Sequence, residues 1–367
     1  MPGRYYQTKP SGPAVDPRRL LRDAAAASPV PVLIYMRNSS WLVLFLAVLP
    51  GVMLAQNAAN PAQIPPAPVP QTPLEWAYAL NTPGVVVLAP EGPQRVPDSD
   101  LEFTFAVPRS LYAPPDWHPG DHPPMPPIVA NGRNPGVFAC AYCHLPNGQG
   151  RPENASLSGL PADYIVQQLR DYRAGLRASA EPQHGPANNM RAIGQNATEA
   201  EVAEAAAYFS SLRPVKWIRV VETDSVRRSV VAGWMYIEDE RNAGLEPIGN
   251  RIIEMPEDLH RTELRDARSG FVAYVPQGSV AKGKALAEGL TISGKTPCAA
   301  CHGADLKGLG PVPALAGRSP SYLARQLYDF QSGSRKGLWS PLMAEVVQGL
   351  GPEDIVNLTA YLASLDP

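Results

Sequence analysis

Two short cysteine motifs constrain this 367-residue chain more than any other feature. The first reads Cys-Ala-Tyr-Cys-His over residues 140–144, and the second reads Cys-Ala-Ala-Cys-His over residues 298–302. Together they use all 4 cysteines of the chain, so none remains for another site. Two intervening residues place both sulfur atoms of a motif on one side of a helical turn, and the histidine follows directly.

The pattern C-x-x-C-H is typical of covalent attachment of c-type haem. Its two thiols add to the vinyl groups of the porphyrin, and its histidine binds the iron on the proximal side. A structural zinc site needs its cysteine pairs closer together, and a thioredoxin-like motif needs a βαβ pattern. We therefore expect two covalently bound haem c groups. The attachment residues would be Cys140, Cys143, Cys298 and Cys301, and the iron ligands His144 and His302.

The N-terminal part of the chain has the pattern of an export signal. Residues 36–55 combine a charged start, a short apolar run and a small residue at the end. We interpret residues 1–35 as an upstream segment, Met36 as the true start and Ala55 as the last residue before cleavage. Export predicts a periplasmic location, where haem c would be attached. The alternative is an uncleaved signal that anchors the protein in the inner membrane.

Both motifs belong to an internal repeat. After each motif comes a helical stretch with Tyr, Gln, Leu, Asp, an aromatic residue, Gly and Arg in one register, at 164–177 and 322–335. An amphipathic helix closes each copy, and in the first copy a Thr198–Glu201 capping box precedes it. The repeat predicts two helical domains, at residues 127–213 and 279–367.

Two methionines occupy equivalent places in the repeat. Met190 lies 18 residues before Tyr208, and Met343 lies 18 residues before Tyr361. We expect both in a loop ahead of the C-terminal helix, each supplying the sixth iron ligand of one haem. His184 competes with Met190 in the first copy, and Met125 is a weaker competitor. Ligation by His and Met leaves no open position on the iron and is typical of an electron carrier.

Each proximal histidine is expected to donate its second ring N–H to a backbone carbonyl, which fixes the orientation of the ring. We expect the carbonyls of Pro152 and Pro311 to accept, because they follow the two histidines after 8 and 9 residues.

These residues resemble the class I c-type cytochromes, and two copies in one chain resemble the exported dihaem cytochromes of bacteria. The resemblance covers about half of the mature chain. It implies a mainly α fold with two cytochrome c-like helical haem domains. It also implies that Cys140, Cys143, His144 and Met190 serve the first haem, and Cys298, Cys301, His302 and Met343 the second.

Two segments depart from that pattern. Residues 56–126 form a proline-rich extension, whose part 114–126 contains two His, two Asp and a Met. We favour a structural role for this part, laid over the first haem domain, above a metal site. Residues 214–278 predict a small β-rich insertion between the haem domains. Its strand-like runs are 217–221, 230–237, 251–254 and 271–275.

The resemblance implies transfer of single electrons between a dehydrogenase or respiratory donor and a downstream acceptor such as an oxidase. The chain would be an electron-transfer protein, not an enzyme, or the cytochrome subunit of a dehydrogenase. The alternative is a dihaem enzyme, peroxidase-like or a sulfur-compound oxidoreductase, with one haem that opens. Redox proteins are the expected partners. A formal net charge of −2 without a basic tract argues against nucleic acid. Membrane contact is expected only if the signal stays uncleaved.

Overall fold

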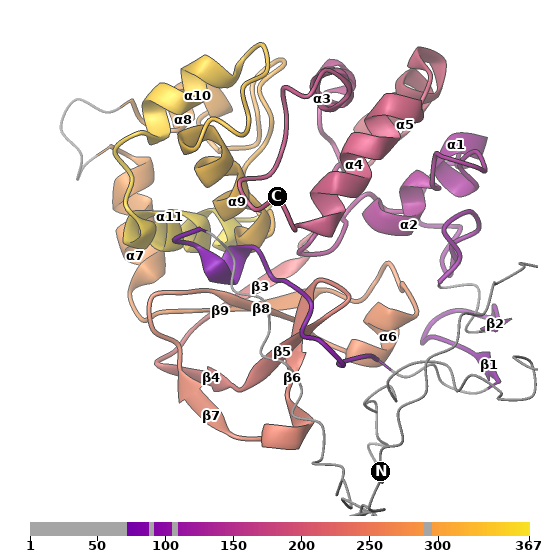
Figure 1. Cartoon of the computed structure of the whole chain (residues 1–367), viewed down its shortest axis with the longest axis horizontal. Helices are drawn as coiled ribbons and strands as arrows, with labels where there is room; N and C mark the ends of the chain where they lie inside the picture. The colour runs from indigo at the N-terminus through magenta and orange to yellow at the C-terminus, as the bar shows by residue number, and fades with distance from the viewer. Residues whose placement is uncertain (1–71, 88–91, 105–108, 290–295) are drawn as a thin grey trace, which may run out of the picture.

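The computed structural model describes residues 72–87, 92–104, 109–289 and 296–367. The expected upstream segment, the signal peptide and residues 56–71 of the extension lie outside these ranges. Within them, no helix is long and apolar enough to cross a membrane. Two helical units lie side by side above a group of short strands (Figure 1).

The first helical unit follows the extension and holds the first cysteine motif. The Thr198–Glu201 capping box forms as expected, with the Thr198 amide donating to the Glu201 carboxylate at 2.8 Å. The apolar stripe of the last helix is buried, with Phe209 only 1% exposed. The helices of this unit are α1 (Pro127–Ala130), α2 (Cys140–His144), α3 (Ala162–Arg173), α4 (Gly185–Asn196) and α5 (Glu199–Ser211).

The second helical unit repeats this order with a longer first helix. Its helices are α7 (Ser279–Ala287), α8 (Ala299–His302), α9 (Pro320–Gln331), α10 (Ser340–Val347) and α11 (Pro352–Ser364). The hydroxyl of Ser319 caps α9 by accepting from the amide of Tyr322 at 3.2 Å. Helix α7 crosses α11 at Gly283, where a Cβ atom would overlap the carbonyl of Asn357. A glycine is therefore required for this close crossing.

The β insertion is built from one mixed sheet, the hairpin β5-β6 and the two-stranded antiparallel sheet β4-β7. The sheet has the order β3-β9-β8, in which β3 (Ile218–Glu222) runs parallel to β9 (Phe271–Val275) and β8 (Ile253–Pro256) runs antiparallel to it. Its other elements are β4 (Ser225–Arg227), β5 (Ser229–Ala232), β6 (Met235–Glu238), η2 (Glu240–Asn242), β7 (Leu245–Pro247) and α6 (Leu259–Glu263).

One expected strand of the insertion is a hairpin instead. The run 230–237 folds back on itself, so that β5 pairs with β6. The chain turns at Gly233 and Trp234, whose φ angles are 58° and 68°. Two consecutive residues with positive φ form the turn that matches the twist of a two-residue hairpin. The apolar character of the run hides this turn in the sequence, because Trp234 is an unusual residue there.

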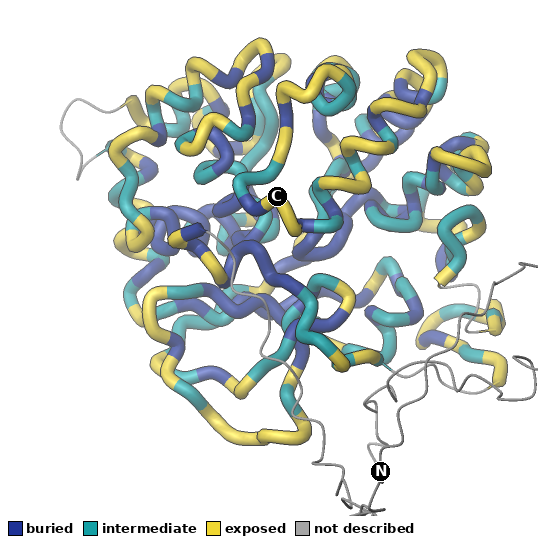
Figure 2. Tube along the Cα trace, in the orientation of Figure 1, coloured by how far each residue is buried: buried dark blue, intermediate teal, exposed yellow. Residues whose placement is uncertain are grey.

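One apolar core joins the extension, the insertion and both helical units. Trp76 of the short helix η1 (Glu75–Ala77) and the following Tyr78 are buried with Phe271 of β9 and Ile355 of α11. Buried residues concentrate where the units meet the sheet (Figure 2). Residues 74–80 of the extension are therefore an integral part of the fold and do more than connect, which is the role that the prolines suggest.

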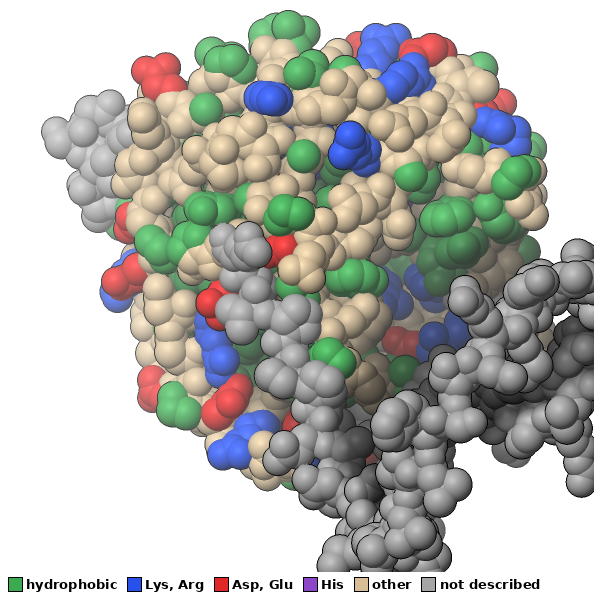
Figure 3. Space-filling model, viewed as in Figure 1, with side chains coloured by type: hydrophobic (Ala, Val, Ile, Leu, Met, Phe, Trp, Pro, Cys, Tyr) green, Lys and Arg blue, Asp and Glu red, His purple; other side chains and the backbone are tan. Residues whose placement is uncertain are grey.

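The segment 114–126 packs as a structural element. The indole of Trp117 donates to the carbonyl of Leu264 at 2.6 Å, and His118 lies 2.9 Å from the carboxylate of Asp266. Within the described ranges, no group of three His, Cys, Asp or Glu side chains is arranged to hold a metal ion. Two further short strands, β1 (Pro93–Gln94) and β2 (Phe103–Thr104), pair earlier in the extension. On the face drawn in Figure 3, positive and negative side chains are interspersed.

Candidate functional site

The first cysteine motif forms the short helix α2, and its histidine is buried. The ring nitrogen Nδ1 of His144 lies 2.8 Å from the carbonyl oxygen of Ala155. A carbonyl can only accept, so Nδ1 carries the proton and Nε2 presents its lone pair. Burial lowers the pKa of His144 to about 4, against a smaller opposing contribution from the Ala155 hydrogen bond. The imidazole is therefore neutral at physiological pH, which is the form that binds iron.

The second motif has the same geometry. Nδ1 of His302 lies 2.8 Å from the carbonyl oxygen of Pro313, and burial lowers the pKa of His302 as well. Cys301 is exposed, whereas Cys140, Cys143 and Cys298 are half-buried.

The prediction that the carbonyls of Pro152 and Pro311 accept from the histidine N–H groups is wrong by a few residues. In both copies the acceptor follows the histidine after 11 residues. A tight turn comes first, closed by the amide of Gly150 on the carbonyl of His144, so the chain needs further residues to return to the imidazole. The carbonyl of Pro152 instead accepts from Arg325 of the second unit at 2.6 Å.

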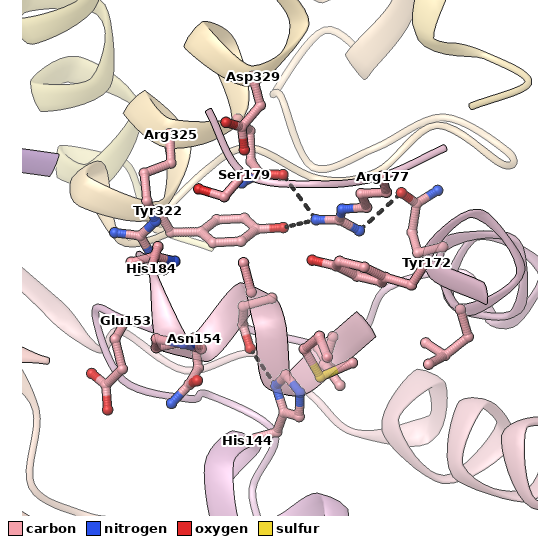
Figure 4. Close-up of a pocket in the computed structure, with 18 of the residues that line it drawn as sticks. His144, Glu153, Asn154, Tyr172, Arg177, Ser179, His184, Tyr322, Arg325 and Asp329 are labelled. Carbon is pink, nitrogen blue, oxygen red and sulfur yellow. Dashed lines mark hydrogen bonds between the residues drawn. The ribbon is translucent and has the colours of Figure 1, made fainter. Parts of the chain in front are cut away.

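Two adjoining cavities lie beside His144. The first, the apolar cavity, is lined by the cysteine pair and by core residues including Val202 and Phe209. The second, the polar cavity, faces the second helical unit and is lined by Arg177, Tyr322, Arg325 and Asp329 among others. His144 and Met190 line both. In Figure 4, His144 lies at the bottom of the polar cavity, and Arg177, Tyr322 and Arg325 lie across its upper part.

The two methionines lie on helices, so the prediction that they lie in loops is wrong. Met190 is half-buried on α4, and Met343 is half-buried on α10. Pro186 and Pro341 occupy the first turns of these helices. Proline is favoured there because the first amides of a helix have no partner within it. Met190 nevertheless reaches the same cavities as His144, as its expected role requires.

His184, like Met190, lines the polar cavity. Its ring is buried between Tyr78 and Trp234, with centroid distances of 6.0 and 6.2 Å. Its Nδ1 atom is buried without a hydrogen-bond partner among the described residues. Burial, followed by the charge of Arg325, holds the pKa of His184 well below its usual range. Met125, the weaker competitor, packs at the edge of the first unit's core and is not among the residues that line either cavity.

The repeated polar residues meet at the boundary between the helical units. Arg177 donates to Gln326 of the other unit at 2.8 Å and to Gln168 of its own unit at 2.9 Å. Arg335 mirrors it, donating to Gln168 at 2.8 Å and to Gln326 at 3.1 Å. The backbones of the two arginines also form an antiparallel bridge. The repeat therefore builds a two-fold-like contact that seals one side of the polar cavity.

Sequence reasoning missed this contact and the role of Arg325. The repeat register shows these Gln and Arg positions, but it does not show that the two copies contact each other through them. The sequence signal for this contact is the repeated occurrence of long polar side chains on helices whose other residues are expected to be buried. Nothing in the repeat marks Arg325, because its counterpart in the first copy is Gln167.

The chemistry of the two cavities fits one covalently held haem. The apolar cavity suits the porphyrin ring and brings both cysteines to one edge. The polar cavity offers the buried guanidinium groups of Arg177 and Arg325, which suit the two anionic propionates at the opposite edge. His144 and Met190 supply one nitrogen and one sulfur donor to the same space.

Comparisons with known proteins agree with this chemistry. The family model for cytochrome c matches residues 130–213 and again residues 281–366. Cytochrome c-554(548) from Halomonas halodenitrificans is 44% identical over 68 residues, which are 18% of this chain and 82% of that protein. Cytochrome c4 from Azotobacter vinelandii is 24% identical over 231 residues, 62% of this chain and 84% of that protein.

A third relative is named for its redox partner. The thiosulfate dehydrogenase electron acceptor of Stutzerimonas stutzeri is 22% identical over 237 residues, which are 64% of this chain and 82% of that protein. The chain thus belongs to the cytochrome c family, as a dihaem class I c-type cytochrome with two covalently bound haem c groups.

Proposed function

We propose that this cytochrome works in the periplasm and passes single electrons from a dehydrogenase or another respiratory donor to a downstream acceptor. The observation that carries the proposal is the meeting of His144 and Met190 in the walls of the same two cavities. With one nitrogen and one sulfur donor from the protein, the iron of a bound haem would keep no coordination position for a substrate. The iron can then change oxidation state with little rearrangement, as an electron carrier requires.

The individual residues take matching roles in the two copies. Cys140 and Cys143 would hold the first haem, and His144 and Met190 would bind its iron. Cys298 and Cys301 would hold the second, with His302 and Met343. When bound, each haem supplies a reversible one-electron iron couple. The protein orients each proximal imidazole through a carbonyl and excludes water with the surrounding apolar core.

The boundary between the units suits exchange of electrons within the chain. The polar cavity beside His144 is closed by Tyr322 and Gln326 of the second unit. Hydrogen bonds of Arg177 and Arg335 fix the two units against each other. Because the units are fixed, the distance between their two haems would stay constant, and so would the rate of electron transfer between them. A constant rate suits a chain that carries two haems.

The name of the third relative supports a dehydrogenase as the donor. That protein is named as the electron acceptor of a thiosulfate dehydrogenase, and its similarity to this chain extends over 64% of the chain. A donor of this class, acting on an inorganic sulfur compound, is the first to test. The cytochrome would act as its mobile acceptor or as a bound cytochrome subunit.

The alternative is a dihaem enzyme, peroxidase-like or a sulfur-compound oxidoreductase. The position of His184 favours it, because this buried imidazole with an unpartnered Nδ1 lies in the same cavity wall as Met190. An enzyme of this kind needs an iron position that opens to substrate.

Carbon monoxide binding to the fully reduced holoprotein separates the two functions. A carrier with two His/Met-ligated irons is expected to take up two electrons per chain reversibly and to keep its spectrum under carbon monoxide. It would also show no turnover with hydrogen peroxide or thiosulfate alone. Stoichiometric carbon monoxide binding at one haem, together with turnover of either compound, would establish the enzyme.

A further inference from the structure

Arg325 is a buried arginine of α9 whose three partners are all uncharged. Its guanidinium donates to the carbonyl of Ala77 and to the carbonyl of Pro152, each at 2.6 Å. The same group lies over the ring of Tyr322, at 5.9 Å from the centroid. Arg325 is 4% exposed, and none of the ion pairs formed by the described residues involves it.

The two acidic side chains that act on Arg325 electrostatically are engaged elsewhere. Asp329 accepts from the hydroxyl of Tyr78 and from the amide of Ala180, each at 2.8 Å. Glu254 accepts from the hydroxyl of Ser319 at 2.8 Å. Both act on Arg325 only through space, and burial lowers the pKa of Arg325. A guanidinium held away from water without a bonded anion is costly, so this position calls for a negatively charged ligand.

The place of Arg325 in the fold indicates which ligand that is. Although it belongs to the second helical unit, it lines the polar cavity beside His144 of the first unit, together with Arg177 (Figure 4). The cysteine pair lies at the other cavity, so the anionic edge of a haem held there would face the two arginines. Guanidinium groups bind carboxylates strongly because they donate two parallel hydrogen bonds.

We propose that Arg325 binds a propionate of the haem carried by the other helical unit, and that its charge raises the reduction potential of that haem. The proposal rests on the haem sites assigned above. A fixed positive charge beside a haem favours the ferrous state, which carries one positive charge less than the ferric state.

The second haem site has no arginine at the position equivalent to Arg325. The residue equivalent to Arg325 in the first unit is Gln167, which donates to Asp171 at 2.8 Å. Arg177 and Arg335, by contrast, are equivalent and balance each other. Arg325 therefore makes the two otherwise repeated sites electrostatically unequal, and this inequality biases the electron toward the first haem.

Redox titration of the holoprotein, followed by absorption, tests the proposal through the variant Arg325→Gln, which copies the residue of the first repeat. The variants Met190→Leu and Met343→Leu assign the two waves, since each displaces the wave of one haem. We expect Arg325→Gln to lower the potential of the first haem and to leave that of the second near its original value. Arg325→Lys, which keeps the charge, is expected to retain most of the original potential.

Arg318→Gln is the matched control. Arg318 is also a buried arginine of the second unit that donates to first-unit carbonyls, those of Ser156 at 2.7 Å and Ser158 at 3.2 Å, but it does not line the polar cavity. We expect it to leave both potentials unchanged. Equal shifts in Arg318→Gln and Arg325→Gln, or no shift in Arg325→Gln, would overturn the proposal.

A second readout covers the case in which Arg325→Gln does not fold. Resonance Raman propionate bands of wild type and Arg325→Lys should differ for the first haem and coincide for the second. Identical bands at both haems would refute the contact. Failure of the proposed function is distinct from either result, because the wild type would then lack two reversible one-electron waves.

Discussion

Arg177 and Arg335 stand in equivalent positions of the repeat, and each donates to the glutamine of the opposite unit at 2.8 Å. The two units are therefore joined by copies of the same residues, facing each other. Both arginines are buried, and the contact lies in the wall of the polar cavity beside His144. The association of the units and the environment of the cofactor thus depend on one small set of side chains.

The symmetry of this contact predicts matched effects at its two glutamines. Gln168→Leu and Gln326→Leu each leave two guanidinium groups with one acceptor fewer, so each should lower the free energy of unfolding by about 1–3 kcal/mol. Denaturant titration of the holoprotein measures both. Gln195→Leu, on the exposed side of α4, serves as the control and should change little. Strongly unequal losses at the two glutamines would contradict the two-fold-like contact.

Loss of either methionine should alter one haem. Met190→Leu and Met343→Leu are each expected to remove about half of the far-red absorption that a Met–Fe(III) bond produces. Met125→Leu is the control, because Met125 packs against the core of the first unit without lining either cavity. If Met190→Leu retained the full band and a His184 variant lost half of it, His184 would be the ligand.

The burial of Glu254 predicts that the free energy of unfolding depends on pH. Burial raises the pKa of this carboxyl to about 7, against opposing hydrogen bonds from Ser319 and Ser321. The native state then binds more protons than the unfolded state between pH 4.5 and 7, so stability contributed by neutral Glu254 is lost as the pH rises through that window. The loss amounts to about 3 kcal/mol at most.

Glu254→Gln tests this, because the amide keeps an acceptor and cannot ionise. Free energies of unfolding are compared at pH 5 and pH 8. We expect the variant to lose less stability than the wild type over this interval. Parallel pH dependences of the two proteins would show that Glu254 is already ionised in the folded state at low pH.

The crossing of α7 and α11 predicts intolerance at Gly283. A methyl group there would overlap the carbonyl of Asn357, so Gly283→Ala should lower the free energy of unfolding by about 1–3 kcal/mol. Gly120→Ala is the comparison, since a Cβ at that exposed position meets no atom within 4 Å. Similar melting temperatures for the two variants would show that the helices can separate at low cost.

The local features of each repeat could be predicted from the sequence, because short-range rules govern them. Helix periodicity accounts for the buried stripe of α5. The unpaired backbone amides at helix starts account for the Thr198–Glu201 box and the Ser319 cap. The placement of His144 with Met190 follows from the repeat register.

The remaining features depend on contacts between distant segments. The hairpin at Gly233 and Trp234 depends on backbone angles that an apolar run conceals. Arg325 binds carbonyls that lie 173 and 248 residues away in the chain, so no local pattern marks it. The helices that carry Met190 and Met343 begin at prolines, and proline is an ambiguous signal because it ends helices but also begins them.

The absorption spectrum of the oxidised holoprotein, calibrated by its haem content, tests the central claim most directly. The account predicts two haems per chain, both low-spin, with a far-red Met–Fe(III) band of the strength expected for two methionine ligands. A band for one methionine, or a high-spin signal at one haem, would contradict a carrier with two closed His/Met sites.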